Sequence, residues 1–186
     1  MEQRVDSKKN KDNLVWIDME MTGLEIEKER IIEIASIITD KNLNILEEGP
    51  NLVIHQPRKI LKAMDSWNQN HHKKSGLLDS VIKSKITTKK AEKRTLDFLK
   101  KYCIPGKCLL AGNAVHHDRR FIAEYMPKLD RFLHYRHVDV TSLKVLIKWW
   151  YPKGKNEFKK KDAHRALDDI RESIEELKYY REHFFK

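Results

Sequence analysis

Alternating and clustered apolar residues predict five strands in this chain. The stretch "RIIEIASIITD" (30–40) is apolar at both alternating sets of positions, which is typical of a central strand buried on both faces. A turn is predicted at "DKNLN" (40–44). The other strands are predicted at "NLVWIDME" (13–20), "LVIHQ" (52–56), "CLLAGN" (108–113) and "HVDV" (137–140).

Apolar residues at spacings of three and four predict helices in most of the remaining chain. Helical patterns cover 59–70, 87–103, 118–129, 141–150 and 164–185. Early strands followed by alternating helices and strands predict an α/β fold, in which helices flank both sides of a mixed five-stranded sheet.

Two acids at the end of the first predicted strand are unexpected. Asp18 and Glu20 stand two residues apart, so in a strand both side chains share one face, about 6.6 Å apart. Asp118 falls in the middle of the apolar face of its helix, although a helix N-cap would also explain an Asp there. Like charges repel each other, so a positive partner is expected nearby.

The closing helix offers a further acid. Around the helix axis, Asp169 lies about 105° and Asp168 about 150° from the apolar face that packs on the core. Asp169 is therefore better placed to reach a cleft. An acid in a first helical turn also complements the helix dipole. His164, just before this helix, is either an incidental loop residue or a group that titrates near neutral pH beside these acids.

Charge favours a polyanionic partner. The 186 residues hold 38 Lys and Arg against 28 Asp and Glu, a net charge of +10.

No apolar run approaches the roughly 20 residues that span a bilayer, and the first residues lack the apolar core of a signal peptide, which predicts a cytoplasmic protein. We expect a disordered basic tail at 1–12, one domain at 13–186, a basic loop at 151–162, and free thiols at Cys103 and Cys108.

The four acids in a basic protein suggest metal-dependent chemistry on a phosphodiester. Asp18, Glu20, Asp118 and Asp169 can share a site if divalent cations neutralise them, and oxygen ligands suit Mg²⁺ or Mn²⁺. Lys or Arg could neutralise them as well, but His164 would then have no evident task. Two cations would stabilise the attacking and leaving oxygens of an in-line displacement.

Four sequence blocks resemble the oligoribonuclease family, in the catalytic-histidine branch of the DEDD exonuclease superfamily. They are "WIDMEMTGL", "AGNAVHHDRRF", "YRHVDVTSLK" and "AHRALDDIRESIEELKYYRE", in the family's order. The resemblance implies an RNase H-like fold and a single exonuclease domain. It also implies a 3′-to-5′ exoribonuclease that degrades short RNA, especially dinucleotides, to 5′-mononucleotides with two Mn²⁺ or Mg²⁺ ions.

The resemblance also assigns roles to individual residues. It implies a homodimer, in which a tyrosine of each subunit completes the active site of the other. Ala114 stands where the family usually has serine, which removes one hydroxyl contact to the 5′ phosphate. The implied roles are metal binding for Asp18, Glu20, Asp118 and Asp169, general base for His164, subunit-completing tyrosine for Tyr135, base contacts for Leu24 and Trp67, and 5′-phosphate contacts for His72, Arg136 and Thr141.

Two other functions remain open at this point. One is a 3′ exonuclease of the same superfamily that acts on DNA or structured RNA. The other is a binding module that holds RNA without cutting it. The second would be expected to lack one of the acids or the histidine, and all five are present.

Overall fold

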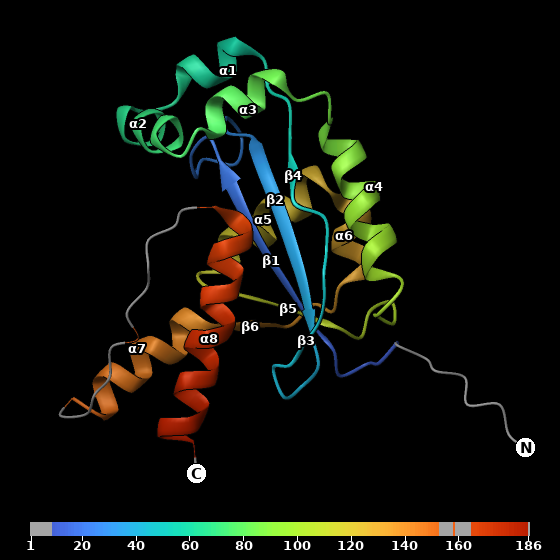
Figure 1. Cartoon of the computed structure of the whole chain (residues 1–186), viewed down its shortest axis with the longest axis vertical. Coiled ribbons are helices and arrows are strands. Elements are labelled where there is room, and N and C mark those ends of the chain that lie inside the picture. The colour runs from blue at the N-terminus through green and yellow to red at the C-terminus, as the bar shows by residue number, and fades with distance from the viewer. Residues whose placement is uncertain (1–8, 153–157, 159–164, 186) are drawn as a thin grey trace, which may run out of the picture.

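The computed structural model describes residues 9–152, 158 and 165–185 (Figure 1). The strands are β1 (Leu14–Met21), β2 (Ile31–Thr39), β3 (Ile45–Glu48), β4 (Leu52–Val53), β5 (Leu109–Gly112) and β6 (His137–Asp139). The helices are α1 (Arg58–Ala63), α2 (Ser66–Lys74), α3 (Leu77–Lys83), α4 (Thr88–Leu99), α5 (His116–Tyr125), α6 (Pro127–Phe132), α7 (Val140–Trp150) and α8 (Ala166–Phe184).

The strands form one mixed sheet in the order β3-β2-β1-β5-β6, with β4 also paired to β2. β1 runs antiparallel to β2 and parallel to β5, which is parallel to β6. All nine residues of β2 are buried, as the sequence predicted for a central strand. The carboxyl ends of β1, β5 and β6 therefore meet at one edge of the sheet.

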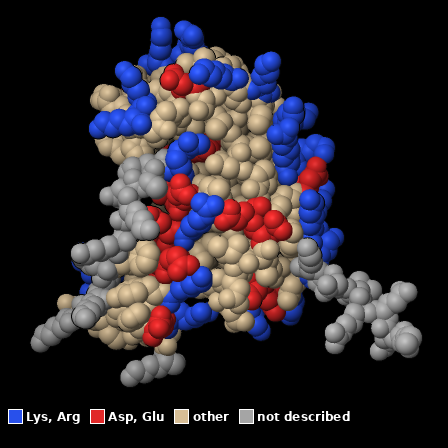
Figure 2. Space-filling view, viewed as in Figure 1, with Lys and Arg blue, Asp and Glu red and all other residues tan. Residues whose placement is uncertain are grey.

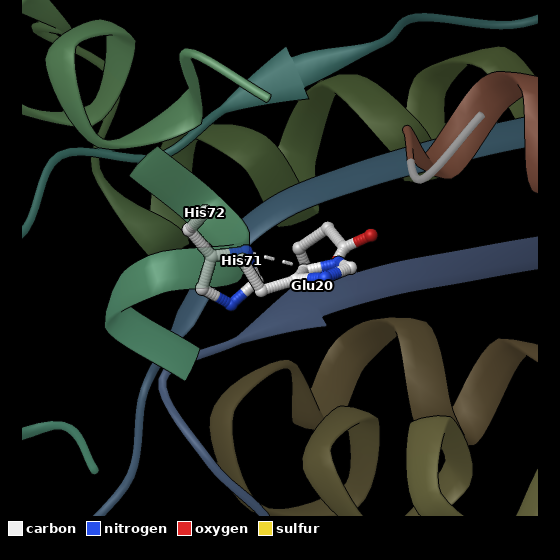
Figure 3. Close-up of side chains that lie close together, drawn as sticks. All are labelled: Glu20, His71 and His72. Carbon is white, nitrogen blue, oxygen red and sulfur yellow. Dashed lines mark ion pairs between the residues drawn. The ribbon is translucent and has the colours of Figure 1, made fainter. Parts of the chain in front are cut away.

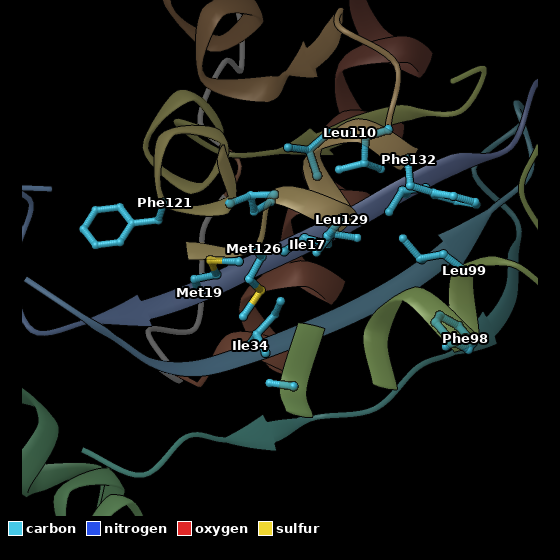
Figure 4. Close-up of a cluster of buried hydrophobic side chains, with 14 of the residues drawn as sticks. Ile17, Met19, Ile34, Phe98, Leu99, Leu110, Phe121, Met126, Leu129 and Phe132 are labelled. Atoms are coloured by element: carbon cyan, nitrogen blue, oxygen red, sulfur yellow. The ribbon is translucent and has the colours of Figure 1, made fainter. Parts of the chain in front are cut away.

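Helices cover both faces of the sheet, which confirms the predicted α/β architecture. Ile17 and Ile34 face α4, α5 and α6 in a core that includes Leu99 and Phe121 (Figure 4). On the opposite face, Trp16 and Ile37 pack with α7 and α8. Asp18 and Glu20 alternate in step with Trp16, so β1 directs both carboxylates toward the side that carries α8.

The short helices α1, α2 and α3 form a cap over one end of the sheet (Figure 1). Their apolar core contains Leu61, Met64, Leu77 and Val81 around Ile32 of β2. The sequence predicted one helix at 59–70, but a break at Asp65 divides it into α1 and α2. α3, which no predicted helix covers, begins after Gly76, which has a φ of 71°. At Asp65, the side chain caps the N-terminus of α2, because it accepts a hydrogen bond from the Asn68 backbone N–H.

Three further details differ from the sequence prediction. The sheet has six strands rather than five, because β3 adds a strand whose four residues are all exposed and carry no alternating pattern. The helix expected at 118–129 is divided into α5 and α6, since Pro127 cannot donate a backbone hydrogen bond and starts the second helix. The expected strand at 52–56 is limited to the two residues of β4.

Several predictions fall on residues outside the described part of the chain. These are residues 1–8 of the expected tail, most of the expected basic loop, and His164. Within the described tail, Asn10 donates its backbone N–H to the carbonyl of Tyr102 at 3.1 Å. Cys103 and Cys108 are buried and free, as predicted. In the described segments, no helix is both long and apolar enough to cross a bilayer.

Candidate active site

A cleft of about 570 Å³ opens where β1 and β5 end. β1 and the loop after it form its floor, and α2 and the start of α5 form its walls. The floor carries Asp18 and Glu20, and Asp118 contributes a third carboxylate from α5.

Asp169 joins these acids from the first turn of α8. One carboxylate oxygen from each of Asp18, Glu20 and Asp169 lies within 4.8 Å of the others. Its neighbour Asp168 instead has a side chain that is 48% exposed and pairs with Arg171 at 2.7 Å. Asp169 therefore lies at the cleft and Asp168 on the surface, as the helical wheel of this segment predicted.

Asp118 lies in the first turn of α5 and is 5% exposed. The N-cap of α5 is Val115, so the alternative that Asp118 serves as the N-cap is wrong. Burial raises the pKa of Asp118 to about 8, although backbone N–H groups, including that of Met19, partly oppose the shift. Asp118 is therefore tied to the middle of β1, beside the other acids.

The grouped charges also perturb Glu20. Burial first, and then the nearby charges of Asp169, Glu33 and Asp118, raise its pKa to about 8, although Arg165 partly opposes the shift. Such carboxylates hold protons at neutral pH unless a cation replaces them. Because the donors are all carboxylate oxygens, the set fits hard divalent cations such as Mg²⁺ or Mn²⁺.

A buried ion pair fixes the start of α8 next to this site. Arg165 donates to both carboxylate oxygens of Glu33, at 2.6 to 3.3 Å, and the Glu33 side chain is fully buried. Glu33 lies directly across from Glu20 in the β1–β2 pair. This pair was not predicted from the sequence, although the lone glutamate within the apolar run of β2 is a signal for it.

Three residues with predicted substrate contacts surround the same acids. Leu24 and Trp67 line the cleft yet are 56% and 67% exposed, so apolar surface remains open to a ligand. His72 of α2 is 2% exposed, and its Nε2 lies 2.9 Å from the Met21 carbonyl oxygen. Its Nδ1 lies 3.8 Å from the Glu20 carboxylate.

Thr141 lies behind the cleft and supports the loop after β5. Its hydroxyl accepts a hydrogen bond from the Ala114 N–H at 2.9 Å and donates to the Asn113 Oδ1 at 3.1 Å. Asn113 in turn donates to Ser173 and Glu176 of α8. Ala114 has a φ of 47°, which an L-residue rarely adopts, so these contacts hold a strained position at the cleft wall.

The structure does not place Tyr135 and Arg136 in this cleft. Both are exposed at the start of β6, whereas the cleft lies where the parallel strands end. The Arg136 guanidinium lies 5.2 Å from the Tyr135 ring centre, so the two form one exposed unit. The placement of His164 lies outside the described residues.

Known proteins align with this chain over almost its whole length. The family model described as Exonuclease matches residues 15–177. The oligoribonuclease of Haemophilus influenzae Rd is 55% identical over 177 residues, which cover 95% of this chain and 97% of that protein. The Coxiella burnetii oligoribonuclease is 55% identical over 172 residues, or 92% of this chain and 94% of that protein. This chain belongs to the oligoribonuclease family.

Solved structures show the same fold in more distant proteins. Escherichia coli exonuclease I, in complex with a 5cy-dT13 oligonucleotide, superposes with a TM-score of 0.71 at 15% identity. The match covers 94% of this chain and 42% of that one. The exonuclease I of Methylocaldum szegediense gives a TM-score of 0.69 at 18% identity over 94% of this chain and 41% of that one. The exonuclease fold expected from the oligoribonuclease resemblance is confirmed.

We expect divalent cations to stabilise the protein more at pH 8 than at pH 5.5. The folded pKa values of Glu20 and Asp118 lie above their ordinary values, so their contribution to stability is present at low pH and is lost as pH rises through about 8. Cations replace the departing protons, and apparent affinity should rise about tenfold per pH unit for each proton displaced. Thermal unfolding with and without Mg²⁺ measures this; an equal shift at both pH values would contradict it.

The Arg165–Glu33 pair should matter for stability. Arg165→Gln leaves the Glu33 carboxylate buried without its partner and should lower the free energy of unfolding by about 2–3 kcal/mol. Arg171→Gln is the matched control, because Arg171 pairs with Glu48 and Asp168 on the surface, where such pairs contribute less than about 1 kcal/mol. Urea denaturation of both variants compares them, and equal losses would refute the role of the buried pair.

Proposed function

We propose that this chain hydrolyses short oligoribonucleotides from the 3′ end and releases 5′-mononucleotides, with dinucleotides preferred. The observation that carries the proposal is the grouping of Asp18, Glu20 and Asp169 within 4.8 Å, with Asp118 lining the same cleft. These acids come from segments up to 151 positions apart along the chain, from 18 to 169. The family relationship indicates the reaction class that such a set serves.

The four carboxylates are proposed to hold two divalent cations, Mg²⁺ or Mn²⁺. When bound, such ions polarise the phosphodiester and stabilise the charge that develops on the attacking and leaving oxygens. The role of Asp18, Glu20, Asp118 and Asp169 is to hold this positive charge at a fixed place. Asp118 is buried and Glu20 is partly buried, which makes each interaction stronger than it is in bulk solvent.

His164 is proposed as the general base that takes a proton from the attacking water. A neutral imidazole suits this task because its ordinary pKa lies near the working pH. His164 is covalently joined to Arg165, whose guanidinium is fixed to Glu33 beside Glu20. This anchor supports the assignment, since it fixes Arg165, the described residue that follows His164 in the sequence, next to the acids.

The cleft walls support a preference for very short RNA. Leu24 and Trp67 expose apolar surface on which bases can stack or insert. His72 and Thr141 are proposed to bind the 5′ phosphate. Arg136 lies outside the cleft of its own chain, next to Tyr135, and is proposed to reach the 5′ phosphate from the partner subunit together with that tyrosine. A longer strand would then have no path beyond these residues. Lys and Arg side chains over α4 and the α1–α3 cap attract a polyanion to the molecule (Figure 2).

A homodimer is proposed to complete each site with Tyr135 of the partner subunit. Tyr135 is 72% exposed and away from the cleft of its own chain, which leaves it available to a partner. Among the aromatic residues of α8, Tyr180 is fully buried and Phe184 packs on the core, so neither offers a surface to a partner. The exposed apolar surface lies on α7 and just after it instead, at Val145, Trp149, Trp150 and Tyr151. Cytoplasmic location stays a prediction from the sequence.

The activity is tested with two neighbouring aspartates. Asp169→Asn removes a carboxylate of the acid set and should lower diribonucleotide hydrolysis in Mn²⁺ at least about 100-fold, because the charge at the reacting centre is lost. Asp168→Asn, one residue away, removes only a surface ion pair and should keep most of the activity. Equal rates for the two variants would refute the assignment of Asp169.

Substrate choice separates the proposed function from its rivals. Rates on two-residue RNA should exceed those on longer RNA and on DNA of either length. Faster cleavage of DNA or of long RNA would favour a general 3′ exonuclease, and tight RNA binding without any cleavage would favour a binding module.

The dimer is tested by mixing two inactive variants. A Tyr135→Ala subunit keeps its acids, and an Asp169→Asn subunit keeps its tyrosine, so a mixed dimer regains one complete site. A 1:1 mixture that exchanges subunits freely should recover about a quarter of wild-type activity, because half of the dimers are mixed and each has one working site. No recovery, together with a 22.2 kDa monomer in sedimentation, would contradict both the dimer and the shared site.

A further inference from the structure

A second group of potential metal ligands adjoins the acid set. Glu20, His71 and His72 each offer a ligand atom within 4.8 Å of the others (Figure 3). The two histidines lie in the last turn of α2, which faces the end of β1. This group has two nitrogen donors and one oxygen donor, whereas Asp18, Glu20 and Asp169 offer oxygen alone.

His72 is oriented as a metal-binding histidine is. A carbonyl oxygen can only accept a hydrogen bond, so the contact between His72 Nε2 and the Met21 carbonyl, 2.9 Å long, puts the proton on Nε2. The Nδ1 lone pair is then free to bind, 3.8 Å from the Glu20 carboxylate. A backbone carbonyl that fixes the far nitrogen is the usual support for a histidine ligand.

His71 is held beside His72 by stacking on Trp67, one turn earlier in α2. The His71 and Trp67 ring centres are 4.8 Å apart and their planes differ by 11°. The His71 and His72 rings are nearly perpendicular, at 79°, with centres 5.3 Å apart. Two imidazoles on one tetrahedral ion, with metal–nitrogen bonds near 2.0 Å, have ring centres about 5 Å apart, so a small side-chain adjustment would suffice.

We propose that Glu20, His71 and His72 form a transition-metal site that takes Zn²⁺ in preference to Mg²⁺. Imidazole nitrogen favours Zn²⁺ and related ions, whereas Mg²⁺ prefers oxygen alone. Three protein ligands leave the fourth tetrahedral position for water. The site is distinct from the acid set, but Glu20 belongs to both.

The shared glutamate makes Zn²⁺ an antagonist of hydrolysis. This consequence rests on the proposed function, in which Glu20 holds an activating cation and His72 contacts the 5′ phosphate. Zn²⁺ on Glu20 and His72 withdraws both groups from those tasks. High Mg²⁺ relieves the antagonism only in part, because Mg²⁺ does not compete for the two histidine nitrogens.

Zn²⁺ binding to the full chain without RNA tests the site directly. Calorimetric titration is done with Mg²⁺ in large excess, so that the oxygen-only positions are filled. Wild-type protein should bind one Zn²⁺ per chain, and His71→Ala and His71→Gln should each bind it at least about tenfold more weakly. His183→Ala is the control, because His183 is exposed at the far end of α8 from the cap and should leave the affinity unchanged (Figure 1).

Two further measurements make the outcome decisive. Zn²⁺ should shift the NMR signals of both the His71 and His72 rings, and circular dichroism confirms that each variant is folded. Equal Zn²⁺ affinity in wild-type and His71 variants, or a wild-type Zn²⁺ signal that excess Mg²⁺ abolishes, would overturn the proposal.

The effect on hydrolysis separates this site from the proposed function. Half-inhibition should require at least about tenfold more Zn²⁺ in the His71→Gln variant than in wild-type protein. If the wild-type chain cleaves no RNA, the proposed function fails while the binding titration still decides the metal site. If it cleaves RNA and Zn²⁺ inhibits wild-type and variant alike, the metal site fails and the function stands.

Discussion

Mutual repulsion of carboxylates is the constraint around which this structure is arranged. Glu20 and Asp118 are buried deeply enough that the pKa of each rises to about 8, and Asp169 adds to the effect on Glu20. A chain that needed only stability would place apolar side chains at these positions. The arrangement becomes favourable when cations occupy the cleft, so the energetic cost of grouping these acids indicates what the cleft binds.

The scaffold opposes this repulsion with contacts that fix each acid separately. Asp118 is held by the Met19 N–H, and the start of α8, which carries Asp169, is held by the Arg165–Glu33 pair. β1 lies between β2 and β5, so Asp18 and Glu20 stand on an interior strand that is paired on both sides. The acids therefore cannot relax by moving apart. Geometry that is fixed in advance is what a site needs when its ligands must meet a reacting phosphate without rearrangement.

The local periodicity of the sequence was enough to predict where the acids lie, but not the contacts that hold them in place. Alternation in β1 predicted the shared face of Asp18 and Glu20, and the helical wheel of α8 distinguished Asp169 from Asp168. The Arg165–Glu33 pair joins residues 132 positions apart, and no repeat of two or 3.6 residues reports such a contact. The same limit applies to the aromatic residues of α7 and α8: the sequence shows apolar residues in both helices, and only packing shows which of them are covered.

The sign of the charge at the cleft differs from that of the molecule as a whole. The net charge of +10 draws RNA inward, and Lys and Arg side chains flank a band of acids in the view of Figure 2. The cleft itself, with Asp18, Glu20, Asp118 and Asp169, repels phosphate until cations neutralise its charge. Long-range attraction and local binding are therefore controlled by different groups. The basic surface determines how often RNA arrives, and the metal content of the cleft determines whether it can stay. Because Glu20 belongs both to the oxygen-only set and to the set with two histidines, the identity of the cation, as well as its presence, should decide whether neutralisation of the acids leads to cleavage.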